Sequence, residues 1–166
     1  NTKAFAIGLN SLYINVKGRE RDGSVDPGDR EALAREIAAK LGGWVDKLTG
    51  DPIVTQPVVR EDIYAGSQLD KAPDVLVGYA PGYRASWATT SGKIPATLLE
   101  PNDDEWSGDH CIDSRQVPGV LLTNQALLKQ QADLRDLTAA IIAYFDIDLP
   151  QYIEGTPAFR AVETMP

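Results

Sequence analysis

The chain has 166 residues, of which 43% are hydrophobic and 24% are charged, and its formal net charge at pH 7 is −8. This length predicts one domain with a sizeable core, and no run approaches the roughly 18 apolar residues of a membrane-spanning helix. The acidic balance argues against binding to a nucleic-acid polymer or an anionic membrane. The single cysteine excludes an internal disulfide framework and a Cys-x-x-Cys zinc site, and it leaves the cellular compartment open.

Two short strands and a helix are predicted in the first third of the chain. Residues 3–9 and 12–16 are rich in β-branched and aromatic side chains, and a turn-forming pair separates them. A helix is predicted to begin at Asp26-Pro27, because aspartate caps helices and proline suits the first turn. Gly42-Gly43 weakens it by roughly 1 kcal/mol per glycine and marks a candidate break. Its apolar positions recur at helical spacing: Leu33, Ile37, Leu41, Trp44 and Leu48.

The middle of the chain predicts two further strands. Residues 53–59 form one of them, and Pro57 indicates an edge position or a bulge. Glu61 to Tyr64 is expected to form one helical turn. The nearly all-apolar run 74–78 is typical of a strand covered on both faces. Residues 79–105 show little period and many turn formers, which indicates a long excursion of the kind that often carries function.

The last third predicts one strand, one helix and a tail. Residues 119–123 read as a buried strand, and residues 146–166 as an irregular tail. Asp133 or Asp136 is expected to cap the helix. The whole pattern indicates an α/β fold. The apolar positions of this helix are Leu134, Leu137, Ile141, Tyr144 and Phe145.

One loop, residues 106–113, holds both the one histidine and the one cysteine of the chain. Imidazole and carboxylate groups bind divalent transition metals, so His110 is a candidate ligand. A lone histidine is more commonly structural or exposed. Asp109 would point away from His110 in an extended chain and is not expected to bind the same metal. One histidine cannot complete a catalytic metal centre.

A nucleophilic pair of Cys111 and His110 is an alternative interpretation of this loop. Catalytic cysteine and histidine partners normally lie far apart in sequence, because neighbours rarely meet with the geometry that a general base needs. A semi-buried structural thiol is therefore the favoured interpretation of Cys111.

Two other stretches carry groups that could bind a phosphate. Residues 17–20 hold Lys17 and Arg19, although a solvated charged turn is the commoner explanation. Residues 79–87 hold Tyr83 and Arg84 as substrate-binding candidates, able to stack on a base or hold a phosphate. The same side chains could equally pin a long loop to the core. The sequence contains no Walker motif, dinucleotide fingerprint or nucleophile elbow.

Several short motifs in a fixed order resemble one family. The chain is similar, from residue 3 to about residue 157, to the C-terminal part of bacterial type I phosphodiesterase/nucleotide pyrophosphatase proteins of the alkaline phosphatase superfamily. The order of the motifs carries the resemblance, since no single motif is specific. They are KAFAIGLN (3–10), LYINVKGRE (12–20), GSVDPG (23–28), APDVLVG (72–78), GYRASW (82–87), WSGDH (106–110) and VPGVL (117–121).

The resemblance implies an alkaline-phosphatase-like sandwich, in which helices flank a mixed sheet, and a site with two metal ions, commonly zinc. In this family a threonine or serine attacks phosphorus, and the metals stabilise the attacking and leaving oxygens. The last histidine ligand comes from a glycine-flanked loop late in the sequence, which His110 resembles. His110 is thereby assigned to the metal site that does not hold the nucleophile. The resemblance assigns no metal role to Asp109, Cys111 or Asp113.

The departure from the family pattern is as informative as the match. The family's nucleophile, its early metal-binding aspartate and its mid-chain ligands all come before the part of the family sequence that matches residue 1 of this chain. The chain is therefore expected to be one C-terminal segment of a larger phosphoric ester hydrolase, inactive alone, whose substrate is a phosphate ester or nucleotide. Its expected partners are the missing N-terminal part and, through exposed strand edges, further copies of itself. The alternative is a non-catalytic module that binds a ligand or partner.

Overall fold

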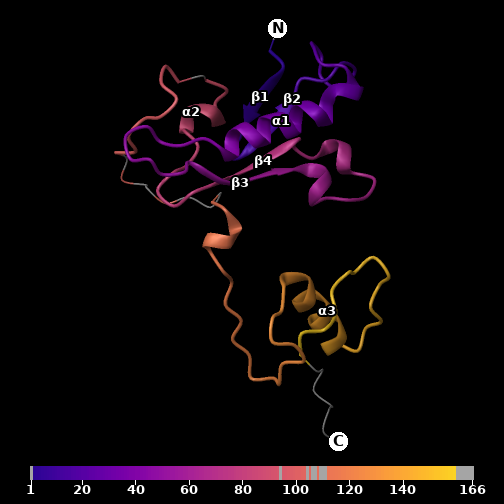
Figure 1. The fold of residues 1–166 in the computed structure, drawn as a ribbon. Helices are drawn as coiled ribbons and strands as arrows, with labels where there is room; N and C mark the ends of the chain where they lie inside the picture. The colour runs from indigo at the N-terminus through magenta and orange to yellow at the C-terminus, as the bar shows by residue number, and fades with distance from the viewer. Residues whose placement is uncertain (1, 94, 104, 106–107, 109–111, 160–166) are drawn as a thin grey trace, which may run out of the picture. The chain divides into compact units, whose positions relative to one another are not determined.

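The structure is a computed structural model that describes residues 2–93, 95–103, 105, 108 and 112–159. Its chain divides into two compact units, residues 1–118 and residues 119–166. The first unit contains a four-stranded sheet, and the second contains the helix α3 (Figure 1). The predicted α/β class is confirmed.

The sheet of the first unit has the strand order β1-β2-β4-β3. Its strands are Ala4–Ile7 (β1), Ser11–Ile14 (β2), Val54–Val59 (β3) and Val75–Tyr79 (β4), close to the predicted positions. All three pairings between these strands are antiparallel.

The positions of β3 and β4 in the sheet follow from their sequences. β3 is an edge strand, and its register against β4 shifts between Val54 and Gln56, as Pro57 indicated. β4 lies inside the sheet, where Val75 is fully buried and Val77 nearly so. The predicted helical turn after β3 is a 3-10 turn, Arg60–Asp62.

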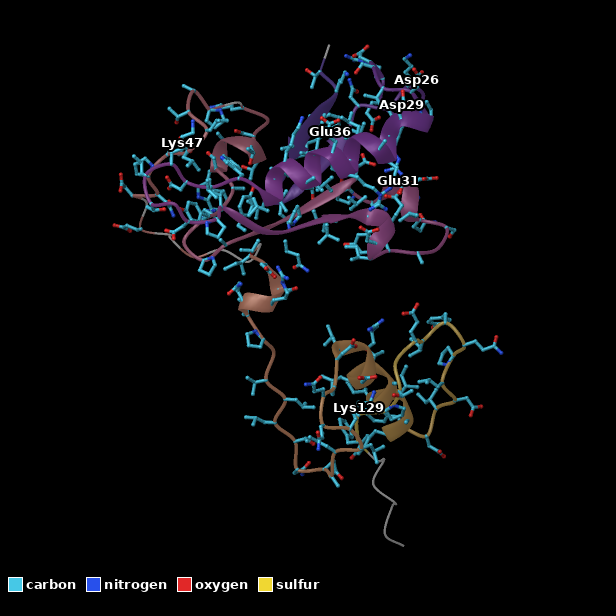
Figure 2. All side chains as sticks on the ribbon, in the orientation of Figure 1. Asp26, Asp29, Glu31, Glu36, Lys47 and Lys129 are labelled. Atoms are coloured by element: carbon cyan, nitrogen blue, oxygen red, sulfur yellow. The ribbon has the colours of Figure 1, made fainter. Side chains whose placement is uncertain are left out.

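Helix α1 (Arg30–Gly42) covers one face of the sheet (Figure 1). A 3-10 turn, Pro27–Asp29, precedes it, and the acidic Asp26 and Asp29 lie at its N-terminal end (Figure 2), where the helix dipole favours negative charge. Ala34 and Ala38 are the buried residues of its inner face. They belong to a core whose other buried members are Ile14, Val16, Val25, Val59 and Val75.

The helix ends at the glycine pair, the candidate break in the sequence, so Trp44 and Leu48 lie beyond it although their spacing is helical. The absent side chain of Gly42 lets the helix end approach Pro57, whose Cγ would lie 3.3 Å from an added Cβ. Leu48 is 96% exposed in the loop beyond. Trp44 packs against a second small core formed by Ile53, Val54 and Val77.

The long excursion after β4 contains one helical turn, α2 (Trp87–Thr90). The Ser86 side chain caps this turn by accepting a hydrogen bond from the Ala88 backbone. The Thr89 hydroxyl donates to the Gly8 carbonyl at 3.1 Å, which ties the excursion to the turn between β1 and β2. A 3-10 turn, Ser114–Gln116, follows later in the same unit.

The second unit is built around α3 (Leu134–Tyr144), which confirms the last predicted helix. Asp133 and Asp136 form a reciprocal capping box at its N-terminus. Lys129, labelled in Figure 2, binds the Asp136 carboxylate at 2.8 Å. The described part of the predicted tail, residues 146–159, contains no helix and only a single-residue bridge, between Leu127 and Phe159.

The predicted buried strand at residues 119–123 is not formed, and this prediction is wrong. Val120 is 86% exposed and Leu122 is 89% exposed. A short apolar run forms a strand only where another strand offers backbone partners, and residues 119–123 have none among the described residues. None of the described helices is long and apolar enough to span a membrane.

Candidate functional site

The candidate site lies where the chain leaves β4. Ile112 forms a parallel bridge with Tyr79, the last residue of that strand, and the Asp113 backbone donates to the Tyr79 carbonyl at 3.2 Å. On the other side of the predicted loop, the Gly108 carbonyl accepts a hydrogen bond from Arg84 at 3.3 Å. Both contacts bring described neighbours of the 109–111 segment to residues 79–84. His110, Asp109 and Cys111 themselves lie outside the described residues.

Asp113 is the most heavily bonded acid near this segment. Its side chain is fully buried, and both carboxylate oxygens are occupied. Oδ1 accepts from the backbone N–H of Arg115 at 2.9 Å and from its Nε at 3.0 Å. Oδ2 accepts from the Arg115 guanidinium at 2.6 Å and from the Thr55 hydroxyl at 2.8 Å. Arg115 also donates to the Thr55 carbonyl at 2.9 Å, which closes a clamp between residues 113–115 and β3.

These contacts keep Asp113 ionised. The Arg115 guanidinium holds the pKa of the Asp113 carboxyl well below its ordinary value, and the Arg115 backbone and the Thr55 hydroxyl act in the same direction. Burial opposes them but does not reverse the shift. A charged buried carboxylate with every oxygen bonded is a structural anchor, since no lone pair is left pointing at a ligand.

Gly78 allows this anchor to reach the sheet. A Cβ at Gly78 would lie 2.9 Å from Gln56 atoms and 3.2 Å from the Asp113 Cα. Only glycine leaves room for the 112–113 backbone to cross β4 at this distance.

The contacts of Tyr83 agree with the interpretation that residues 79–87 pin a long loop to the core. Its hydroxyl donates to the Asp46 carboxylate at 3.0 Å and lies 3.4 Å from the Thr49 hydroxyl. Its ring packs against the small core around Val54 and Val77. The Leu48 backbone chiefly lowers the pKa of Asp46, and the Tyr83 hydroxyl adds to this effect. The Tyr83 hydroxyl is therefore engaged inside the fold.

Arg84, the second substrate-binding candidate, is half-buried, as Tyr83 is. Its guanidinium lies 4.3 Å from the ring centre of Trp87, a cation–π distance, and Trp87 is 51% exposed. The same guanidinium reaches the Gly108 carbonyl. Arg84 therefore joins an exposed aromatic surface to the segment that precedes His110 in the sequence.

The Lys17–Glu20 stretch fits neither of its two interpretations completely. Lys17 is exposed and pairs with Asp26, as a solvated turn would. Arg19 instead pairs with Glu20 and, at 2.6 Å, with the fully buried Asp74. A phosphate at Arg19 would have to displace these carboxylates.

Asp74 is the centre of a buried charge network that the sequence did not reveal. Its oxygens accept from Arg19, from Arg30 at 2.9 Å and from the Ile14 backbone at 2.7 Å. Arg60, also buried, lies within 3.5 Å. Burial acts to raise the pKa of the Asp74 carboxyl, but the hydrogen bonds from Arg19, the Ile14 backbone and Arg30 outweigh it and hold this pKa below its ordinary value. The sequence signal for this network was an acid placed directly before an apolar strand. The network joins α1 to the sheet.

The metal-binding capacity of the described residues is limited. Across residues 2–93, 95–103, 105, 108 and 112–159, no group of three or more histidine, cysteine, aspartate or glutamate side chains could hold a metal ion. No protein-family model, curated protein or solved structure matches this chain. Family membership therefore stays a prediction from the ordered motifs.

Proposed function

We propose that this chain is a C-terminal segment of a metal-dependent phosphoric ester hydrolase of the phosphodiesterase/nucleotide pyrophosphatase type. In this proposal the complete protein has the alkaline-phosphatase-like sandwich, and His110 is one ligand of a two-metal site, commonly a zinc site. The ordered motifs from residue 3 to about residue 157 support it. The chain alone lacks turnover, because one imidazole cannot hold two catalytic metals.

The observation that carries the proposal is the meeting of two predicted elements at one strand end. Gly108 and Ile112, which flank the segment with His110, contact Arg84 and Tyr79. Active sites of α/β folds commonly lie at strand ends, where loops bring distant residues together. A site for phosphoric ester hydrolysis needs a metal ligand and a cationic side chain that binds phosphate, both at the same strand end.

Each residue has a distinct role in this proposal. Metal ions supply positive charge to the attacking and leaving oxygens. His110 contributes a neutral imidazole to one of them. Arg84 presents a guanidinium, which suits phosphate oxygens, while Trp87 beside it offers an aromatic surface. Tyr83 holds the loop that carries Arg84, through its bond to Asp46.

Hydrolysis of bis(p-nitrophenyl) phosphate tests the proposal. The protein encoded by the complete reading frame should turn over this substrate with zinc, and His110→Ala should lower kcat on the order of 100-fold or more, as removal of a metal-site residue does. Lys40→Ala, an exposed change on α1, serves as control. Family-like rates from this chain alone, or full activity of the His110→Ala protein, would contradict the proposal.

A second candidate is a non-catalytic binding or assembly module. Large exposed apolar side chains favour it, since Leu134 is 79% exposed and Tyr152 is 81% exposed in the second unit. The outer edges of β1 and β3 have no strand partner in the described part of the chain, which also favours self-association. Light scattering after size exclusion separates the candidates, because an assembly module would form defined oligomers and a clean monomer at high concentration would count against it.

A further inference from the structure

Helix α3 is apolar on two opposite faces. Ala139 and Ala140 are fully buried on one of them. Leu134, Ile141 and Phe145 follow each other at spacings of seven and four residues, which places them together on the outer face, and each is more than half exposed. A helix with apolar side chains all round is normally buried on all sides. The outer face of α3 therefore lacks a covering layer among the described residues.

Residues 119–122 are a second feature of this unit that has no partner. Within the described part of the chain, none of their backbone groups takes part in a hydrogen bond. Val120 and Leu122 are almost entirely exposed, and in an extended segment they share one face while Leu121 lies on the other. Apolar side chains on both faces are typical of a segment inside a sheet. The run thus combines a free backbone with two apolar faces.

We propose that residues 119–122 and the outer face of α3 form one docking surface for the N-terminal part of the complete protein. The inference rests on the proposed function, in which this chain is one segment of a sandwich of sheet and helices. Residues 119–122 form no strand in this chain, because no strand lies beside them among the described residues. The partner supplies that strand, and backbone hydrogen bonds join the run to its edge, as in β-strand addition.

The order of the two features favours a sheet as the surface of the partner. An extended run followed by a helix is the unit from which parallel and mixed sheets are built, and its helix covers the sheet to which the run is added. A partner that offered only a helix would cover α3 and leave the backbone of residues 119–122 unbonded. A second copy of this chain is disfavoured, because two chains that each carry a net charge of −8 repel one another.

Hydrogen exchange, measured by mass spectrometry on this chain and on the protein encoded by the complete reading frame, tests the docking surface. The amides of residues 119–122 should exchange on the order of 100-fold more slowly in the complete protein, because paired amides exchange only when the segment opens. In this chain alone the same amides should exchange at the unprotected rate at every protein concentration.

Substitutions in the complete protein show whether α3 belongs to the same surface. Leu122→Ala and Ile141→Ala each remove an apolar side chain that the partner buries, and each should speed the exchange of residues 119–122 about tenfold. Both side chains are exposed in this chain, so its own fold does not depend on them. Leu48→Ala is the matched control, since it removes a leucine that is equally exposed but lies outside the surface, and it should leave this exchange unchanged.

Three results would overturn the inference. The first is unprotected exchange of residues 119–122 in the complete protein, and the second is unchanged exchange in its Ile141→Ala variant. The third is protection in this chain alone that rises with its concentration, which would identify a second copy as the partner. The hydrolase proposal fails separately, because an inactive complete protein with slow exchange at residues 119–122 contradicts only the proposed activity. An active hydrolase with free exchange there contradicts only the docking surface.

Discussion

Two aspartate-x-arginine sequences in this chain adopt the same local geometry in different surroundings. Asp113 and Asp133 each accept a hydrogen bond from the backbone of the residue two positions on, at 2.9 and 2.7 Å. Each also pairs with the guanidinium of that residue, Arg115 or Arg135, at 2.6 Å. Asp113 begins a 3-10 turn, and Asp133 begins α3. The local sequence is sufficient for this cap.

The surroundings make the two caps different. The Asp113 side chain is fully buried and gains Thr55 as a distant partner, whereas the Asp133 side chain is 50% exposed. Arg115 turns back to the Thr55 carbonyl, and Arg135 turns to Glu154, which is exposed. The exposed cap therefore only starts a helix. The buried one holds a loop to a sheet.

Each cap also lies near a glycine that permits a close backbone approach. Gly78 makes room for Asp113, and Gly155 lies against the Arg135 carbonyl so closely that a Cβ would overlap it. In the second unit this backbone contact, together with Asp136, fastens the segment around Thr156 to α3. Each unit thus combines an aspartate side chain with a glycine that permits a close backbone contact.

The largest expected effect comes from Gly155→Ala. The added Cβ would collide with the backbone of Arg135, which cannot move without breaking the helix cap, so we expect a loss of about 3 kcal/mol in the stability of the second unit. Hydrogen exchange of residues 119–159 measures it. Gly119→Ala is the control, because nothing lies within 4 Å of its added Cβ. Equal protection in both variants would contradict the close approach.

Asp113→Ala should have the next largest effect. It leaves the Thr55 hydroxyl and the Arg115 guanidinium without their buried acceptor, which costs about 2–3 kcal/mol of unfolding free energy. Urea unfolding followed by tryptophan fluorescence reports on residues 1–118, where all three tryptophans lie. The cost of Asp133→Ala to the second unit, measured by hydrogen exchange of residues 119–159, should be smaller. An equal cost of the exposed cap would contradict the comparison.

The charge of Asp113 predicts a smaller, pH-dependent effect. Its folded-state pKa lies below the ordinary value of 3.8, mainly because Arg115 bonds the charged form. Stability from this shift is fully present above pH 3.8 and is lost as pH falls towards the folded-state pKa. The difference in unfolding free energy between wild type and Asp113→Asn should be flat above about pH 5 and shrink below pH 4. A difference that grows on acidification would contradict this sign.

The sequence predicted those features of the fold that depend on neighbours along the chain. The turn between β1 and β2, the edge position of β3 with Pro57 and the Asp133 cap all rest on residue types within a few positions of each other. The run at 119–123 was misread, because a short apolar stretch has no period of its own and depends on a partner strand.

The candidate site was less predictable for the same physical reason. His110 was proposed from its residue type and from the motif around it, both of which are local features of the sequence. The role of Asp113 depends on Thr55, 58 residues away, and that of Asp74 on Arg19 and Arg30, 55 and 44 residues away. No local pattern encodes such pairings. The sequence leaves two roles open for Tyr83, stacking on a base or pinning a loop to the core. The hydrogen bond of its hydroxyl to Asp46 favours the second role.

The most direct test of the anchor is a double-mutant cycle between Thr55→Val and Asp113→Asn, with the free energy of unfolding of residues 1–118 as the readout. If the two side chains act as one clamp, the second change should add little to the first, and the coupling should reach about 1 kcal/mol. A parallel cycle between Thr55→Val and Asp133→Asn should be additive. Additive effects of Thr55→Val and Asp113→Asn would contradict the account.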